Sequence, residues 1–211
     1  TDLTCSATAT DEDGDTPTLT YAWTNSTEGT TLGTGSTLTL TSSNSAPSDT
    51  ILCTATATDA DGGTDTGTDS VSVDNTDPVL TSVNISPSTG VDTYTSLTCT
   101  ATATDDDGGT PTLTYAWTND DSGDVLGTGT TVDLDPAISQ PGETITCTAT
   151  ATDADEGTDT GTHSVSVDNT DPVVTSVTIS PSPGIDTSTA LSSSATLTAD
   201  DGYTLTLTFA Y

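Results

Sequence analysis

The sequence contains a long tandem repeat, and this repeat limits the possible folds more than any other feature. Residues 1–94 align with residues 95–188 without a gap, and about 70% of the aligned positions are identical. Cys5 returns as Cys99 and Trp23 returns as Trp117, in each case 94 positions later (99 − 5 and 117 − 23). A unit of this length is a domain, not one turn of a solenoid. The sequence therefore predicts two similar domains followed by the start of a third.

The alignment divides the chain into three segments. We expect a first repeat at residues 1–76, without its first strand, a second repeat at residues 77–170 and a partial third repeat at residues 171–211. The third copy holds only the first strands, and it has Ser193 at the cysteine position. Half of a β-sandwich leaves an apolar face and a strand edge uncovered. We therefore expect that the chain continues or that another chain completes this fold.

Apolar and hydroxyl side chains alternate along each repeat. This period-2 pattern runs through residues 3–10, 19–23, 37–40, 51–58 and 79–85, and turns containing Asp, Gly or Pro separate the runs. Thr is β-branched and favours strands. No window has the apolar period of an amphipathic helix. We expect an all-β chain with about seven short strands per repeat.

The charge composition excludes several classes of function. The chain has 32 acidic residues, one His and neither Lys nor Arg, so its formal net charge is −32. A polyanion of this kind repels nucleic acid phosphates and anionic membrane surfaces. No apolar run is long enough to span a bilayer, so we expect no membrane insertion of this segment. The chain also lacks Met and a signal peptide, which indicates a mature or internal segment of a longer protein.

Each full repeat contains the order Cys…Trp…Cys. No Cys-x-x-Cys pair is present and the single His is not repeated, so the cysteines are poor candidates for a zinc site. The order resembles an immunoglobulin-like sandwich, in which a disulfide joins strands B and F against a Trp on strand C. The resemblance implies a disulfide and a core tryptophan in each repeat: Cys5–Cys53 with Trp23, and Cys99–Cys147 with Trp117. Disulfides in turn imply an oxidising compartment outside the cytosol.

Other parts of the repeat resemble related families. The segment 11–23 is similar to the first half of a PKD-type repeat, and the segment 58–66 is similar to the final hairpin of that family. The segment 74–78, Asp-Asn-Thr-Asp-Pro, resembles the calcium linker of cadherins. One feature departs from antibody domains, because Ile51 and Ile145 replace the usual Tyr two residues before the second Cys. Together these resemblances imply tandem Ig-like antiparallel β-sandwich domains of an extracellular or cell-surface protein.

Acidic residues gather in the loops between strands B and C, in the loops between strands F and G, and in the linker. In an Ig-like sandwich the two loops lie at the end where the chain enters, so the linker should meet the loops of the repeat that follows. Converging carboxylates are stabilised by a cation that accepts many oxygen ligands, as Ca²⁺ does. The candidate calcium ligands are Asp74, Asn75, Asp77, Asp105, Asp107, Asp153 and Asp155. Solvated turns are the alternative, because Asp and Gly are ordinary turn residues, and the sequence leaves both open.

The remaining candidates are single residues. Asn25 and Asn84 each begin an Asn-x-Ser/Thr pattern, which makes them candidate glycosylation sites. His163 replaces Asp69 of the first repeat, and we expect it to be an exposed strand residue. Paired carboxylates are also the groups that glycosidases use. A site that recurs in every repeat suits binding or structure better than catalysis, so we expect no enzyme.

These observations predict a non-enzymatic structural region of a secreted or cell-surface protein, such as a stalk, an adhesin shaft or an extracellular filament subunit. The expected partners are other copies or further repeats of the same chain. The alternative is a module that binds a glycan or a protein through its BC and FG loops. Such a module exposes aromatic side chains at its loop tips, and Tyr94 is the one candidate near a domain junction.

Overall fold

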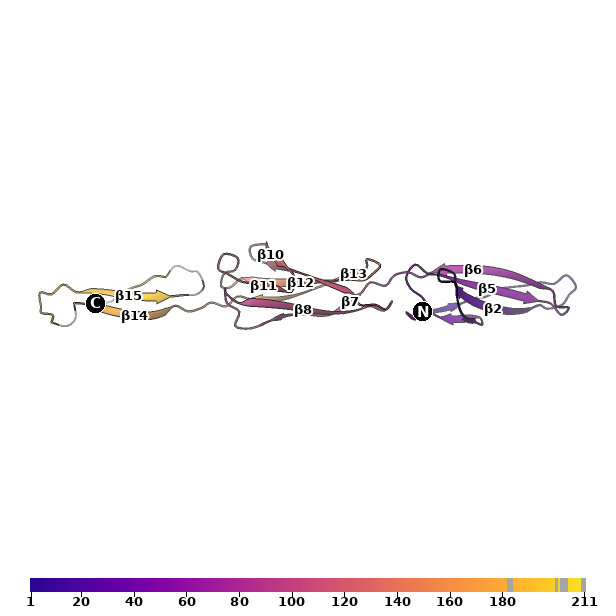
Figure 1. Ribbon diagram of the computed structural model, residues 1–211, viewed down its shortest axis with the longest axis horizontal. Coiled ribbons are helices and arrows are strands. Elements are labelled where there is room, and N and C mark those ends of the chain that lie inside the picture. Colours follow the sequence, from indigo (N-terminus) through magenta and orange to yellow (C-terminus); the bar gives the residue numbers. More distant parts are fainter. Residues whose placement is uncertain (182–183, 200, 202–204, 210–211) are drawn as a thin grey trace. The chain divides into compact units, whose positions relative to one another are not determined.

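The computed structural model describes residues 1–181, 184–199, 201 and 205–209, and Figure 1 labels its strands. The regular secondary structure of these residues is entirely β-strand. Contacts divide the chain into two compact units, of which the first contains Thr1–Val79, Ala103–Thr112 and Ala151–Asp159, and the second contains the remaining residues. This division differs from the predicted repeat boundaries, which stay a prediction. The predicted third repeat includes several residues outside the described set.

The first repeat contributes six strands. They are β1 (Asp2–Thr4), β2 (Thr18–Asn25), β3 (Thr30–Thr34), β4 (Thr37–Thr39), β5 (Thr50–Thr58) and β6 (Thr64–Ser72). β1 pairs with β4, and the other four strands form a sheet in the order β3-β2-β5-β6. In the antiparallel pair of β2 with β5, Trp23 lies opposite Cys53 and Tyr21 lies opposite Ala55. The alternation in the sequence therefore places these apolar side chains on one face.

The second repeat contributes seven strands. They are β7 (Val79–Ser86), β8 (Ser96–Thr104), β9 (Thr112–Asn119), β10 (Asp124–Thr128), β11 (Thr131–Asp133), β12 (Thr144–Thr152) and β13 (Thr158–Ser166). They form two sheets, in the orders β11-β8-β7 and β10-β9-β12-β13. A disulfide joins β8 to β12, which lie in different sheets. This is the arrangement of an immunoglobulin-like sandwich, with β8, β9 and β12 as strands B, C and F.

The core of each repeat surrounds its tryptophan. In the second repeat Trp117 packs in a buried cluster with Ile85, Leu97 and Ile145, together with Val, Leu and Cys side chains from the remaining strands. The buried cluster of the first repeat is smaller and consists of Trp23, Leu38, Ile51 and Cys53, with half-buried apolar residues around it. The tandem β-sandwich fold that the sequence predicts is confirmed.

A β-hairpin follows the second repeat. β14 (Val173–Ser180) and β15 (Ser192–Thr198) pair antiparallel, with Val177 opposite Ala195 and Ile179 opposite Ser193. Every residue of β14 is exposed. The apolar residues Val173, Val174, Val177 and Ile179 of β14 are exposed, whereas Ala195 and Leu197 of β15 are half-buried. The assignment of this hairpin to a partial third repeat stays a prediction.

One predicted strand is shorter than expected. The alternating pattern predicts a strand over residues 3–10, but the structure assigns strand only to Asp2–Thr4. The matching segment of the second repeat forms the long strand β8, which pairs with β11 on one side and β7 on the other. Within the described residues, no strand occupies the place of β7 beside residues 5–10. An isolated segment lacks the ladder of hydrogen bonds that defines a strand, and this explains the difference.

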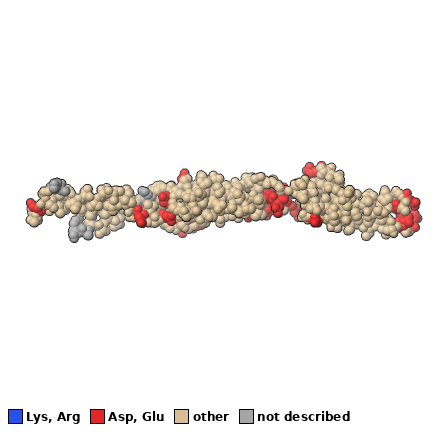
Figure 2. Space-filling model, turned by 90° about the horizontal axis from the view of Figure 1, so that it is seen from below, with Lys and Arg blue, Asp and Glu red and all other residues tan. Residues whose placement is uncertain are grey.

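No helix among the described residues combines the length and the apolar character needed to cross a membrane. On the face of the molecule shown in Figure 2, Asp and Glu side chains gather in separate patches, and most of the surface is neutral.

Candidate functional site

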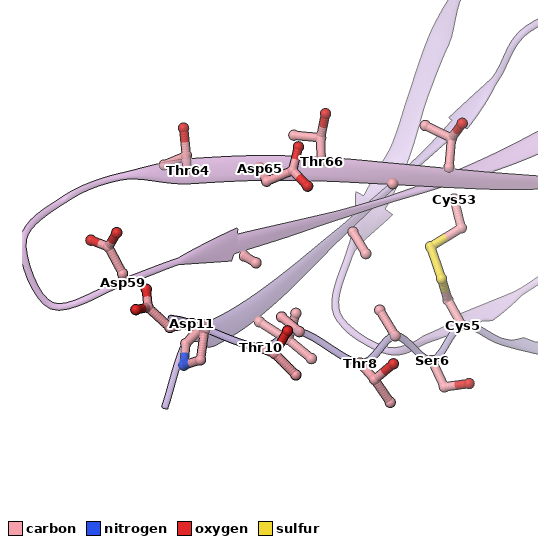
Figure 3. Close-up of a pocket in the computed structure, with 18 of the residues that line it drawn as sticks. Cys5, Ser6, Thr8, Thr10, Asp11, Cys53, Asp59, Thr64, Asp65 and Thr66 are labelled. Carbon is pink, nitrogen blue, oxygen red and sulfur yellow. A yellow bond between two sulfur atoms is a disulfide. The ribbon is translucent and has the colours of Figure 1, made fainter. Parts of the chain in front are cut away.

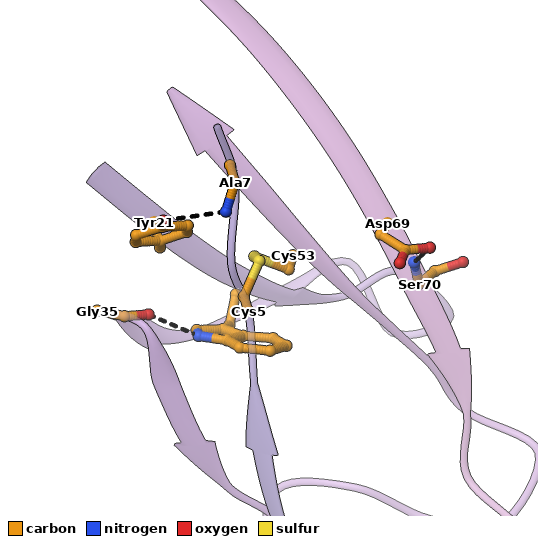
Figure 4. Close-up of a disulfide and its surroundings, with 8 residues drawn as sticks. Cys5, Ala7, Tyr21, Gly35, Cys53, Asp69 and Ser70 are labelled. Atoms are coloured by element: carbon orange, nitrogen blue, oxygen red, sulfur yellow. Dashed lines mark hydrogen bonds between the residues drawn. A yellow bond between two sulfur atoms is a disulfide. The ribbon is translucent and has the colours of Figure 1, made fainter. Parts of the chain in front are cut away.

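Two disulfides join the cysteine pairs that the Ig-like resemblance implies. Cys5 is bonded to Cys53 and Cys99 is bonded to Cys147, with Cα–Cα distances of 6.5 and 6.4 Å. Figure 4 shows the first bond beside Tyr21, whose hydroxyl accepts the backbone N–H of Ala7 at 3.2 Å. The described chain contains no free cysteine.

Each core tryptophan is fixed in the same way in the two repeats. The indole N–H of Trp23 donates to the carbonyl of Gly35 at 2.8 Å, and the indole N–H of Trp117 donates to the carbonyl of Gly129 at 3.0 Å. A buried indole needs such a partner, since an unpaired buried N–H group is costly. The two tryptophans are therefore structural groups of the core, as the sequence predicts.

The linker, Asp74–Pro78, lies against the two acidic loops of the second repeat, and all of these residues belong to the first compact unit. Asn75 Nδ2 donates to Asp153 Oδ2 at 3.0 Å. The backbone N–H of Thr76 donates to Asp107 Oδ2 at 2.5 Å, and the hydroxyl of Thr76 donates to Asp107 Oδ1 at 3.3 Å. The sequence predicts this meeting of linker and loops correctly, although it does not predict which atoms interact.

The carboxylates of these loops also hold their own turns. Asp153 Oδ1 accepts the backbone N–H groups of Gly157 at 2.7 Å and of Asp155 at 2.9 Å. The hydrogen bond from Asn75 is the main reason why the pKa of Asp153 lies below its ordinary value, and the two backbone donors lower it further while burial opposes them. A donor that favours the charged form thus keeps this carboxylate ionised to lower pH.

The same turn occurs in the first repeat. Asp59 Oδ1 accepts the backbone N–H groups of Gly63 at 2.7 Å and of Asp61 at 3.0 Å, and Asp11 Oδ1 accepts the N–H of Asp13 at 2.7 Å. Asp and Asn side chains commonly stabilise turns by such local hydrogen bonds. The recurrence of this turn in both repeats indicates that these aspartates primarily stabilise the conformation of the loops.

The predicted calcium ligands are only partly brought together. Asn75 contacts Asp153, while Asp107 is held separately by Thr76. A Cβ atom at Gly157 would lie 2.6 Å from both Asn75 Nδ2 and Asp77 Oδ1, so Asp77 is close to Asn75. Asp105 accepts the N–H of its own turn at Asp107, and Asp74 and Asp155 are exposed. The carboxylates of Asp107 and Asp153 accept N–H donors in this arrangement, and Asn75 directs its nitrogen at Asp153. No group of three or more His, Cys, Asp and Glu residues in the described ranges is placed to hold a metal ion.

The two candidate glycosylation sites differ in accessibility. Asn25 is only 2% exposed, and its Nδ2 atom, which would carry the sugar, donates to Asp49 Oδ2 at 2.6 Å. A glycan on Asn25 therefore does not fit the folded chain. Asn84 is exposed on β7, and its glycosylation stays a prediction.

His163 is less exposed than the sequence predicts. It lies on β13 but is half-buried, and its Nδ1 atom accepts the backbone N–H of Ile85 at 3.3 Å. It is a strand residue, as expected, but the expectation that it is exposed is wrong, because Ile85 of β7 contacts it. Tyr94 is 60% exposed, as a binding residue would need. The acidic loops 11–17, 59–63, 105–111 and 153–157 carry no aromatic residue, so the predicted aromatic loop tips of a binding module are missing from them.

Sequence reasoning missed a buried amide in each repeat. Asn119 Nδ2 donates to Glu143 Oε2 at 2.7 Å and to the carbonyl of Ile138 at 3.1 Å, and Asn25 and Asp49 form the equivalent pair. The sequence does contain a signal for this pair. Asn25 recurs as Asn119, and the acidic residue Asp49 recurs as Glu143, in each case 94 positions later. The pair ties the end of strand C to the loop before strand F and satisfies the buried polar groups.

Comparisons with known proteins add no family. No protein-family model and no curated protein matches the chain. Among solved structures, an amphioxus IgVJ-C2 molecule is 15% identical with a TM-score of 0.41, and the match covers 79% of this chain and 96% of that one. Fibronectin(III)-like modules of Clostridium thermocellum CbhA are 18% identical, with a TM-score of 0.31 and coverage of 79% and 85%. A tetra-tandem repeat from the extending region of a large adhesion protein is 18% identical, with a TM-score of 0.35 and coverage of 90% and 57%.

The sheets, the disulfides and the tryptophans of this chain are themselves those of immunoglobulin-like sandwiches.

Proposed function

We propose that the chain is a structural region of tandem repeats in a secreted or cell-surface protein, in the role of a stalk, an adhesin shaft or an extracellular filament subunit. One observation supports this proposal: each of the two full copies builds a sandwich with its own disulfide and its own hydrogen-bonded tryptophan. Such disulfides persist in oxidising compartments, and this supports a location outside the cytosol.

The state of the acidic loops supports a structural role over a catalytic one. A general acid of a glycosidase needs a carboxyl group whose pKa is raised. Asp153 has the opposite property, because Asn75 and two backbone N–H groups lower its pKa. The aspartates of the first repeat are likewise engaged in turns, as Asp59 and Asp11 show.

The composition also suits an exposed position. The chain contains neither Lys nor Arg, so proteases of trypsin specificity find no cleavage site in it. Its high negative charge keeps it soluble and opposes non-specific binding.

Immunogold electron microscopy tests the proposal. An antibody raised against the chain should label the outer surface or extracellular filaments of intact source cells, without permeabilisation. Labelling confined to the interior of permeabilised cells would overturn it. A glycan array with the same purified chain tests the alternative, since a selective hit abolished by Tyr94→Ala would favour a binding module.

Calcium at the linker is a separate proposal, with Asp77, Asp107 and Asp153 as its nearest carboxylates. Ca²⁺ would draw these oxygens together and replace the N–H donors that now hold them. Calorimetric titration of metal-free chain should give a saturable heat that Asp77→Asn weakens. No heat from the wild-type chain would contradict calcium binding and leave the hydrogen-bonded linker as the complete arrangement.

A further inference from the structure

In the described residues, the second repeat protects two of its four sheet edges and leaves the other two unprotected. This repeat has chain on both sides of it, and its two sheets end in β11 and β7 and in β10 and β13. An edge strand can pair with a strand of another chain, and proteins prevent this with short strands, bulges, prolines or lysines. The four edges differ in these features.

The strands β11 and β10 carry such protection. β11 has three residues, and β10 has five and loses its regular register between Val125 and Gly127. In contrast, β13 has nine residues, Thr158–Ser166, which include neither proline nor lysine. The other long edge, β7, packs beside β13, since a Cβ atom at Gly161 would lie 3.0 Å from Val83 Cγ2. One side of the sandwich therefore carries both unprotected edges.

The backbone of β13 alternates between β12 and the open edge. The N–H of Val167 donates to the carbonyl of Glu143 at 2.9 Å, just beyond the strand ends. At the other end, the N–H of Asp153 donates to the carbonyl of Gly157 at 3.1 Å. Both contacts direct odd-numbered residues toward β12. Successive residues of an antiparallel ladder direct their backbone groups to opposite sides, so even-numbered residues such as Thr162 direct theirs to the edge.

The side chains of β13 also alternate. Its even-numbered residues are all Thr or Ser and are exposed, whereas its odd-numbered residues are half-buried or buried. Figure 3 shows the equivalent strand of the first repeat, β6, where Thr64 and Thr66 lie on one side with Asp65 between them. Pairs of Thr and Ser across neighbouring antiparallel strands are favourable. The edge therefore offers a backbone ladder together with a row of hydroxyl groups.

We propose that β13 pairs with β13 of a second copy, antiparallel and about a two-fold axis at Thr162. In this register Thr158 lies opposite Ser166, so the strands pair over their full length and the two four-stranded sheets become continuous. A two-fold contact uses the same surface on both copies and closes into a dimer. The contact rests on the proposed function, in which copies of the same chain are the expected partners, and it names the surface that they use.

The sequence of β13 suits pairing with itself. In this register Gly161 lies opposite His163, and Asp159 lies opposite Val165. Neither two bulky side chains nor two carboxylates meet directly, and like charges placed directly opposite each other would destabilise a strand pair. A second copy is therefore a fitting occupant of this edge.

Charge sets the condition for the contact. In the same register Glu156 lies opposite Asp168 just beyond the strand ends, and each copy carries a formal net charge of −32. On the face shown in Figure 2 the acidic side chains gather in separate patches, so the repulsion is concentrated at a few places. Salt screens such repulsion. Dimerisation should therefore strengthen as salt is added.

Amide hydrogen exchange in the unmodified chain tests the pairing. In dilute solution the N–H groups of Thr162, Ser164 and Ser166 should exchange rapidly, because they face the open edge. In concentrated solution with added salt their exchange should slow at least about tenfold, because each then donates to the second copy. The N–H groups of His163 and Val165 point toward β12 and are the internal control, with slow exchange under both conditions.

Cysteine cross-linking gives a second measurement. Thr162→Cys should form a disulfide with its own copy, because hydrogen-bonded residues opposite each other have Cα atoms about 5.5 Å apart, within the range of disulfides. Thr128→Cys is the matched control, since Thr128 is also an exposed threonine at an edge of this sheet, but on the short and irregular strand β10. The control should give at least about tenfold less covalent dimer.

The proposal is wrong if the edge amides exchange at the same rate under both conditions, or if Thr162→Cys and Thr128→Cys cross-link equally. A dimer whose edge amides still exchange rapidly would place the contact on another surface and would also contradict it. The same holds if a synthetic peptide of the β13 sequence protects these amides in a chain that stays monomeric at high salt, since the edge would then accept a strand from another protein. Cell-surface labelling depends on none of these measurements, so the proposed function and this contact can fail separately.

Discussion

The first and second repeats have similar sequences but differ in how completely their cores are covered. Cys99 is fully buried, whereas Cys5 is only half-buried, and Val165 is buried while Val71 is exposed. The second repeat owes this cover to β7, which lies beside β8. The first repeat has no such strand among the described residues.

This comparison shows that a strand depends on its neighbour as much as on its own residues. Residues 5–10 keep the alternation of β8 almost unchanged, yet they form no ladder. Propensity and pattern describe a surface that fits into a sheet, and the sheet forms only when the partner edge is present. The two repeats of one chain therefore act as a matched experiment on the effect of a single strand.

Removal of the disulfides should give the largest difference in stability between the two repeats. Each bond joins residues 48 positions apart, and the chain-entropy estimate for such a loop is about 4 kcal/mol. We expect Cys5→Ala with Cys53→Ala to unfold the first repeat, because its buried cluster is small. Cys99→Ala with Cys147→Ala should leave the second repeat folded with a lower urea midpoint.

The two indole N–H signals in ¹H–¹⁵N spectra make this measurement possible. The chain has two tryptophans, one in each repeat, so each signal reports the folding of one repeat during urea titration. Each double variant serves as the control for the other. An equal decrease of the urea midpoint in both repeats would show that the covering strand β7 adds little stability to the second repeat.

Truncation of a β7 side chain should give the next largest effect. Ile85→Ala removes a buried side chain from the core of the second repeat and should lower its stability by about 3 kcal/mol. Ile179→Ala, at the same position of the exposed hairpin, should change stability by no more than about 0.5 kcal/mol in dilute solution. Urea unfolding monitored by the Trp117 indole signal measures both. A large effect of Ile179→Ala at low concentration would mean that β14 is covered within a single copy.

The sequence predicts the covalent and periodic parts of this fold well. The Cys…Trp…Cys order resembles an Ig-like sandwich, and this resemblance leads to the observed disulfides. The alternation of apolar and hydroxyl residues leads to strands such as β2 and β5, because it depends only on neighbouring residues. The meeting of the linker with Asp107 and Asp153 also follows, since the resemblance to an Ig-like sandwich places both loops at one end.

The sequence does not predict features that depend on a second strand or on side-chain direction. His163 looks like a surface residue in its own strand, but β7 half-buries it and uses its Nδ1 atom as an acceptor. Asn25 matches a glycosylation pattern, yet its amide is directed at Asp49 inside the fold. In both cases the deciding contact comes from a residue distant in the sequence, and no local pattern reports it.

Alanine at the two equivalent glycines should have opposite effects. Gly67→Ala adds a Cβ atom in open space and removes the flexibility of glycine, so it should stabilise the first repeat by about 0.5 kcal/mol. Gly161→Ala places a Cβ atom 3.0 Å from Val83 Cγ2, which is too close without movement of β7, and should destabilise the second repeat by about 1 kcal/mol. Urea unfolding in dilute solution, monitored by the two indole N–H signals, measures the stability change that each substitution causes. Stabilisation by both substitutions would mean that β7 moves away at little cost.

Protonation of Asp153 should give the smallest change in stability. It should also distinguish the loop at Asp153, which the linker contacts, from the corresponding loop of the first repeat at Asp59. Because Asn75 and two backbone N–H groups lower the pKa of Asp153 in the folded chain, the unfolded chain binds its proton at higher pH. The stabilisation is therefore complete above the ordinary Asp pKa of about 4 and is lost as the pH falls through the lower folded value.

Carboxyl ¹³C NMR titration of Asp153 measures this directly. Asn75→Ala removes the largest cause of the shift, so the pKa of Asp153 should rise toward its ordinary value, while the N–H groups of Gly157 and Asp155 keep part of the shift. Thr76→Ala is the matched control, since it removes a hydroxyl that bonds to Asp107 instead and should leave the titration of Asp153 unchanged. An unchanged pKa in Asn75→Ala would show that the linker does not hold Asp153 in solution, and the linker-bound loop would then be equivalent to the free loop of the first repeat at Asp59.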